Sequence, residues 1–198
     1  MNFTFTSKSN NPSQLNRLVA GFKSLNKPMG KKRLETFPRK FKNQRLHFGM
    51  PVEIIRRAAG RAFSAHQVKK IALGILELLD KNQAELSVAL VDNAEIRKLN
   101  AKFRAKDYST DVLSFPAGDA LPPEARLLGD VVISVEKAKE QAKERRRSLK
   151  EEMALLLIHG IVHLLGYDHE RSAKEAKLMG RLEKKIYRKL CDRGILEL

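Results

Sequence analysis

Three of the five histidines of this 198-residue chain fall within one short stretch, as His159, His163 and His169. His159 and His163 stand four residues apart, so on a helix their rings share one face, with Cβ atoms about 5 to 6 Å apart. Gly166 can adopt the left-handed conformation that ends a helix, which would bring His169 back toward the other two. The spacing therefore predicts three imidazoles around one metal ion.

Three neutral imidazoles leave one coordination position open for water, as in catalytic zinc sites, and zinc lowers the pKa of that water to ~7. We therefore expect one Zn²⁺ per chain, with nickel, copper and iron as other metals that imidazole accepts. Asp168 has two alternative interpretations. It is either the carboxylate that accepts a hydrogen bond from a ligand imidazole or an ordinary turn residue.

The same histidine spacing occurs in the metzincin peptidases. Those enzymes need a Glu directly after the first histidine as general base for the metal-bound water, and this chain has Gly160 there. The pattern supports the metal geometry and does not support peptide hydrolysis.

The helices that must position the histidines are predicted from caps and apolar periodicity. Ser148 and Glu151 form a capping box before a helix that is apolar almost all round, so this helix should lie inside the domain. Caps at Ser64, Asp92 and Ser172 predict three more helices, each with one apolar face. Residues 136–147 are predicted to be a charged helix with a solvated face.

Four short apolar stretches are predicted to be strands, at residues 51–56, 86–91, 112–115 and 130–135, with a loop at 117–123. We therefore expect a single α+β domain, in which helices pack on a mixed sheet of about four strands and carry a zincin-like three-histidine metal site.

Residues 1–49 contain eleven Lys and Arg side chains and one Glu, a net charge of +10, without apolar periodicity. We expect them to be a disordered basic extension. Three alternatives explain it: a nucleic-acid-binding arm, an organelle-targeting peptide, or a start codon assigned too far upstream. The third is favoured, with the domain beginning at Met50 and covering residues 50–198, whose net charge of +6 suits a polyanionic partner.

A single cysteine, Cys191, excludes a disulfide framework and fits a reducing compartment. No apolar stretch reaches the roughly 20 residues that cross a bilayer. We expect a cytoplasmic protein without a membrane partner. Targeting to an organelle through residues 1–49 is the alternative.

The YbeY family has a signature motif that residues 159–169 resemble, with the sequence His-Gly-Ile-Val-His-Leu-Leu-Gly-Tyr-Asp-His. Residues 99–116 and 128–134 resemble two further segments of that family. The resemblance covers residues 50–198. It implies a metal-dependent endoribonuclease specific for single strands, which acts in the maturation of small-subunit ribosomal RNA. It implies as partners ribosomal RNA, the small ribosomal subunit and ribosome-associated proteins, and leaves the oligomeric state open.

Arg104 matches the functional arginine of that family, so the resemblance implies a catalytic role for it. Its planar guanidinium can bind a phosphate through two hydrogen bonds, whereas the residue types alone would equally suit a solvated surface charge. Lys102 and Lys106 are candidates for unspecific phosphate attraction.

Other candidate substrate-binding residues are Asp111 and Ser114, beside the third predicted strand, where they could orient water or substrate. Tyr167 and Phe115 could stack on an unpaired base, although core packing is the favoured interpretation for Phe115. Two alternative functions stay open: a metallohydrolase acting on a substrate other than RNA, and a ribosome-associated RNA-binding factor with structural zinc. Structural zinc would need a fourth protein ligand.

Overall fold

The computed structural model describes residues 51–58, 63–117 and 126–197. The predictions for residues 1–49, for Met50 and for most of the 117–123 loop lie outside these ranges. The helices and strands, in chain order, are β1 (Val52–Arg56), α2 (Ala65–Leu78), β2 (Glu85–Val91), α3 (Asn93–Arg104), β3 (Val112–Pro116), β4 (Leu127–Ser134), α4 (Val135–Glu144), α5 (Leu149–Leu164) and α6 (Ala173–Asp192).

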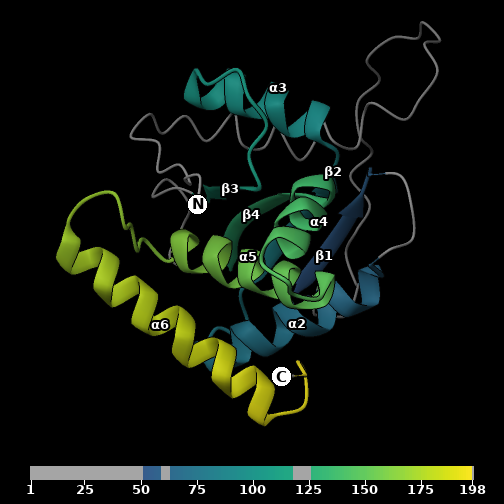
Figure 1. Ribbon diagram of the computed structural model, residues 1–198. Coiled ribbons are helices and arrows are strands. Elements are labelled where there is room, and N and C mark those ends of the chain that lie inside the picture. Colours follow the sequence, from purple (N-terminus) through teal and green to yellow (C-terminus); the bar gives the residue numbers. More distant parts are fainter. Residues whose placement is uncertain (1–50, 59–62, 118–125, 198) are drawn as a thin grey trace, which may run out of the picture.

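The four strands form one mixed sheet in the order β1-β2-β4-β3. β1, β2 and β4 run parallel, and β3 pairs antiparallel with β4 at one edge. Helix α3 lies on one side of the sheet, while α5 lies on the other side beside α2, which packs on β1, and α6 packs on both of these helices (Figure 1). The predicted α+β class and the mixed four-stranded sheet are confirmed.

Side-chain caps begin the helices where the sequence predicted. Ser64 and Gln67 form a reciprocal capping box at α2, Asp92 accepts the Glu95 N–H at α3, and Ser148 and Ser172 cap α5 and α6 in the same way. These hydroxyls and carboxylates satisfy amide groups that the first helical turn leaves without partners.

The bounds of β4 and α4 differ from the prediction at both ends, and α4 ends at Glu144 where the charged helix was predicted to reach Arg147. β4 begins at Leu127, three residues earlier than expected, because residues 127–129 pair with the start of β2 and the end of β3. The strand ends at Ser134, whose hydroxyl accepts the Lys137 N–H at 3.2 Å and so starts α4 at Val135.

Helix α5 occupies the centre of the larger hydrophobic core, as its apolar sequence predicted. It packs between the sheet and α6, and its buried residues include both Met153 and His163. A smaller core under α3 contains Ile96, Leu99 and Phe115. Of the helices in the described ranges, none combines the length and apolarity that a membrane crossing requires.

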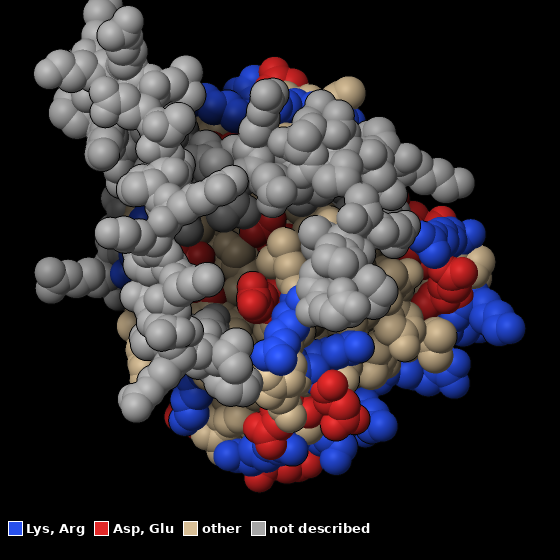
Figure 2. All heavy atoms as spheres, turned by 180° about the vertical axis from the view of Figure 1, so that it is seen from behind, with Lys and Arg blue, Asp and Glu red and all other residues tan. Residues whose placement is uncertain are grey.

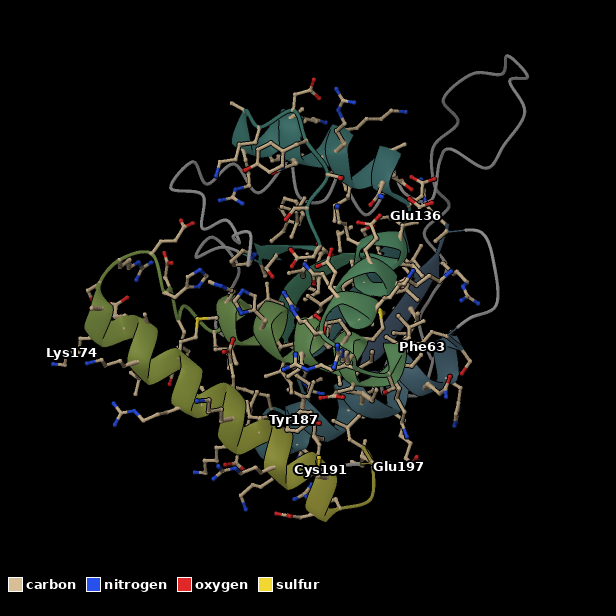
Figure 3. The ribbon with its side chains drawn as sticks, in the orientation of Figure 1. Phe63, Glu136, Lys174, Tyr187, Cys191 and Glu197 are labelled. Carbon is tan, nitrogen blue, oxygen red and sulfur yellow. The ribbon has the colours of Figure 1, made fainter. Side chains whose placement is uncertain are left out.

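Helix α6 is amphipathic and packs on α5 and α2 with a face that includes Met179, Ile186 and Leu190, which are at most 2% exposed. Figure 3 shows Tyr187 and Cys191 on the inner side of this helix and Lys174 pointing away from the body of the molecule. One face of α6 is therefore fixed against the helix that carries two of the histidines.

A buried carboxylate at the start of α5 forms ion pairs with two arginines of the segment between α4 and α5. The side chain of Glu152, 1% exposed, receives Arg145 on one oxygen and Arg147 on the other, the latter at 3.5 Å. Glu152→Gln is expected to lower the free energy of unfolding by about 3 kcal/mol, because it leaves the half-buried Arg145 guanidinium without its counter-charge, whereas the more exposed Arg147 keeps Glu151 at 3.4 Å. Urea unfolding measures this, with Glu140→Gln, an exposed ion-pair partner, as the control expected to cost less than about 0.5 kcal/mol. Equal effects of the two substitutions would contradict the assignment.

Asp130 on β4 lies in one cross-strand row with Ser87 and Glu53. Burial raises the pKa of Asp130 to about 6; a hydrogen bond with Ser87 opposes this rise, and the charge of Glu53 adds to it. The folded protein therefore holds this proton more tightly than the unfolded chain does, and stability is lost as the pH rises from about 4 to about 6.

Asp130→Asn is accordingly expected to raise the free energy of unfolding by about 1 to 2 kcal/mol at pH 7.5 and to have little effect near pH 4. Urea unfolding of both proteins at the two pH values measures the difference. A gain of the same size at both would show that the ionised carboxylate is not the cause.

Candidate metal centre

The three histidines converge as predicted. Nitrogen atoms of His159, His163 and His169 all lie within 4.8 Å of one another. The ring centroids of His159 and His163 are 4.6 Å apart, and that of His169 lies 5.4 Å and 5.2 Å from them. Nitrogens this close together could hold one metal ion, to which each would bond at roughly 2.0 to 2.1 Å if the ion were zinc.

The turn after α5 delivers the third histidine. The helix ends at Leu164, the Gly166 N–H donates to the His163 carbonyl at 2.9 Å, and Gly166 adopts a φ of +89°. Because side chains strain this conformation, glycine lets the chain reverse within three residues of His169.

The environment of His163 keeps its ring neutral. Burial lowers its pKa to about 3, helped by the neighbouring charges of His159 and His169. A metal ligand must present a free lone pair, and His163 does so throughout the neutral pH range.

Glu183 of α6 is a neighbour of the cluster that the sequence analysis missed. Its Oε1 lies 2.7 Å from Nδ1 of His159. The available signal was the position of Glu183 on α6, four residues after buried Met179 and three before buried Ile186, where an apolar side chain would be expected.

Asp168 serves as a turn residue, one of its two predicted roles. Its Oδ1 accepts the Glu170 N–H at 2.9 Å, and its Oδ2 lies 3.4 Å from Nε of Arg171. The side chain is buried beside the third histidine, so the carboxylate fixes the loop that carries His169. Its predicted bond to a ligand imidazole stays a prediction.

Arg104 lies beside the metal centre. Its side chain is 7% exposed, and Nη2 is 3.9 Å from Oε1 of Glu170, the residue directly after the third histidine. The chain turns sharply behind it, with Ala105 in the left-handed region at a φ of +56°. The Arg104 side chain is thus packed inside the protein and points toward Glu170, in contrast to the solvated surface charge that the residue types also allowed.

The other candidate substrate-binding residues fall into two groups. Lys102 is exposed, 5.0 Å above the Phe103 ring, and Lys106 is half-buried. Tyr167 is partly buried against the larger core. These positions leave their predicted contacts with substrate as predictions.

Asp111 and Ser114 are buried and form hydrogen bonds that connect β3 with α4 and α5. The Asp111 carboxylate accepts the Val112 N–H and the Gln141 amide, both at 2.9 Å, while the Ser114 hydroxyl donates to the Gly160 carbonyl at 3.0 Å. Neither side chain faces solvent in this conformation. Their predicted contact with substrate stays untested, and their visible contacts orient β3 against α4 and α5.

Gly160 faces the sheet and not the metal centre. A Cβ at this position would lie 2.8 Å from Cγ1 of Val131 and 3.2 Å from the Ser114 hydroxyl. The glutamate that peptidases place after the first histidine therefore has no room here, which agrees with the prediction against peptide hydrolysis.

Comparison with known proteins gives a consistent match. The model of the family described as Endoribonuclease YbeY matches residues 54–191. The protein named Endoribonuclease YbeY from Sulfurihydrogenibium sp. (strain YO3AOP1) is 50% identical to this chain, over 62% of this chain and 81% of that protein. The corresponding protein of Persephonella marina is 47% identical over 68% of this chain and 88% of its own length.

A solved structure supports the same fold. The solution structure of TM1509 from Thermotoga maritima aligns with a TM-score of 0.51 and 29% identity, covering 71% of this chain and 91% of that protein.

Proposed function

Since this chain belongs to the YbeY family of endoribonucleases, we propose that it is a zinc-dependent enzyme that cuts single-stranded RNA in the maturation of small-subunit ribosomal RNA. The observation that carries the proposal is the convergence of three imidazoles beside Arg104. Cleavage of a phosphodiester requires a centre that stabilises negative charge on the phosphate oxygens. A metal ion on the three imidazoles, together with the Arg104 guanidinium, would provide such a centre.

The residues of the site have separate roles. His159, His163 and His169 would hold the metal, which when bound acts as a Lewis acid and lowers the pKa of water. Arg104 would bind a non-bridging phosphate oxygen through its guanidinium fork. Within the described ranges, the group of ligands that can share an ion has three members, which favours a catalytic site over a structural one with a fourth protein ligand.

The proposal includes the small ribosomal subunit and its RNA as partners and the cytoplasm as compartment. In support, residues 50–198 carry a net charge of +6. Figure 2 shows basic and acidic side chains interspersed on the described part of one face, without a patch of a single sign. On that part of the surface, RNA recognition would depend on individual side chains more than on a broad basic patch.

Among the aromatic side chains of the described ranges, Tyr108 is the one exposed enough to stack on an unpaired base. It is 44% exposed, whereas Phe115 is 6% exposed and packs edge-on against Phe103. The backbone at Tyr108 is tied to α3, because the buried Asn100 amide donates to the Tyr108 carbonyl at 2.8 Å, and Arg97 forms an exposed bidentate ion pair with Asp107. An exposed ring four residues after Arg104 suits single-strand recognition.

Tyr108→Ala is expected to weaken binding of single-stranded RNA by about 1 to 3 kcal/mol, the usual contribution of one stacked base. Tyr108→Phe should bind like the unmodified protein because it keeps the ring face. Fluorescence anisotropy with single-stranded and duplex RNA measures both. An equal loss for duplex RNA would show that stacking is not the cause.

The test of the proposed function is elemental analysis of the purified protein together with cleavage of single-stranded RNA, before and after chelation. We expect about one zinc per chain and cleavage that stops on chelation and returns with zinc. Casein and duplex RNA serve as comparison substrates. Cleavage of casein alone would favour another metallohydrolase, and RNA binding without any cleavage would favour a binding factor with structural zinc.

A further inference from the structure

We propose that Glu183 is a positioning residue of the metal centre, which fixes His159 in the tautomer that presents Nε2 to the metal. The inference rests on the proposed metal-dependent function and concerns a residue outside the histidine motif. Oε1 of Glu183 lies 2.7 Å from Nδ1 of His159, and the two side chains are 27% and 24% exposed.

The contact is built into the packing of two helices. Glu183 belongs to α6 and His159 to α5, and α6 is fixed there by Met179 and Ile186, which flank Glu183 on the same side and are 1% and 2% exposed. A half-buried carboxylate on the core-facing side of a helix is unfavourable unless it gains a polar partner. The His159 imidazole supplies that partner.

The chemistry of the pair determines which ring nitrogen is free. A neutral imidazole carries one N–H, and an ionised carboxylate can only accept a hydrogen bond. The proton of His159 therefore lies on Nδ1, and the lone pair on Nε2 is left for a metal. Carboxylate partners of this kind orient the ring and increase its basicity as a ligand.

Glu183 acts through His159 and not as a ligand itself. The set of ligand atoms that lie within 4.8 Å of one another comprises the three imidazoles, and Glu183 is not part of it. Because the carboxylate comes from α6, metal affinity is linked to the docking of that helix.

The test compares Glu183→Ala and Glu183→Gln with Glu144→Ala, which removes an exposed carboxylate from α4. Zinc affinity is measured by competition with a chromophoric chelator, and the His159 tautomer by ¹⁵N NMR of the metal-free protein. Glu183→Ala should weaken zinc binding about 10- to 100-fold and give a mixture of His159 tautomers. Glu183→Gln, whose amide oxygen still accepts the N–H, should keep the Nδ1–H tautomer with a smaller loss, and Glu144→Ala should change neither.

Unfolding midpoints in urea show whether each variant folds. The His159 tautomer is then measured in every variant that folds. Wild-type zinc affinity together with an unchanged tautomer in Glu183→Ala would overturn the inference while leaving the proposed function intact. Conversely, a protein that binds no zinc but whose His159 tautomer shifts in Glu183→Ala would overturn the proposed zinc dependence and support the orienting role of Glu183.

Discussion

His163→Ala is expected to remove zinc from the protein and to reduce RNA cleavage to the background left after chelation, a loss of roughly 10³-fold or more. His163 is the most buried of the three histidines, at 1% exposed, and its ring contacts both of the others. Because burial lowers its pKa to about 3, its ring is neutral and can offer a lone pair to a metal near pH 7. Without it, two imidazoles remain where a catalytic site needs three ligands.

Elemental analysis gives the zinc content, and a labelled single-stranded RNA gives cleavage and affinity separately. RNA affinity should be largely retained, since the proposed role of the ring is to bind the metal and not the phosphate backbone. His66→Ala, an exposed histidine of α2 outside the cluster, is the matched control and should behave like the unmodified protein.

Removing a buried ring also leaves a cavity that costs stability, so His159→Ala provides a second variant at a more exposed ligand. Both variants should lose zinc. Unchanged zinc content in either one, in a folded protein, would disprove its assignment as a ligand.

The cluster of three histidines could be predicted because it depends on residues that are close together in the sequence. The four-residue spacing of His159 and His163 needs only a helix, and Gly166 needs only a turn, so neighbouring residues determine the geometry. The same holds for the caps at Ser64 and Ser148, where a side chain bonds an amide three residues away.

Contacts between distant segments could not be predicted in this way. Glu183 meets His159 across a helix interface 24 residues away in sequence, and nothing near either residue indicates the partner. The early start of β4 likewise depends on its pairing with β2. Both features depend on tertiary packing, which a single sequence does not display.

Burial separates the candidate side chains that pack inside the protein from those that reach solvent. Phe115 packs in the smaller core, as favoured. Ser114 and Asp111 direct their polar atoms to backbone and side-chain partners within the protein, because the third strand is buried on both faces. Tyr108, which the sequence analysis did not single out, is more exposed than either of the predicted stacking residues.

Arg104→Glu is expected to leave zinc content unchanged and to lower RNA cleavage by about 10²- to 10³-fold, the usual cost of removing one donor that stabilises transition-state charge. The guanidinium is 3.9 Å from Glu170, next to His169, without belonging to the metal ligands. The substitution should therefore act on the phosphate and not on the metal. Elemental analysis and single-turnover cleavage of single-stranded RNA separate these two effects.

Lys102→Glu is the matched control, since it makes the same change of charge on the same helix at an exposed position. A general loss of electrostatic attraction would weaken RNA binding equally in both variants and would lessen with added salt. A specific role for Arg104 predicts instead a large loss of turnover confined to Arg104→Glu. Arg104→Lys should fall between, because it keeps the charge but loses the two-pronged fork. Wild-type turnover in Arg104→Glu would reduce Arg104 to a packing contact of the loop after α5, and the imidazole cluster alone would then have to account for catalysis.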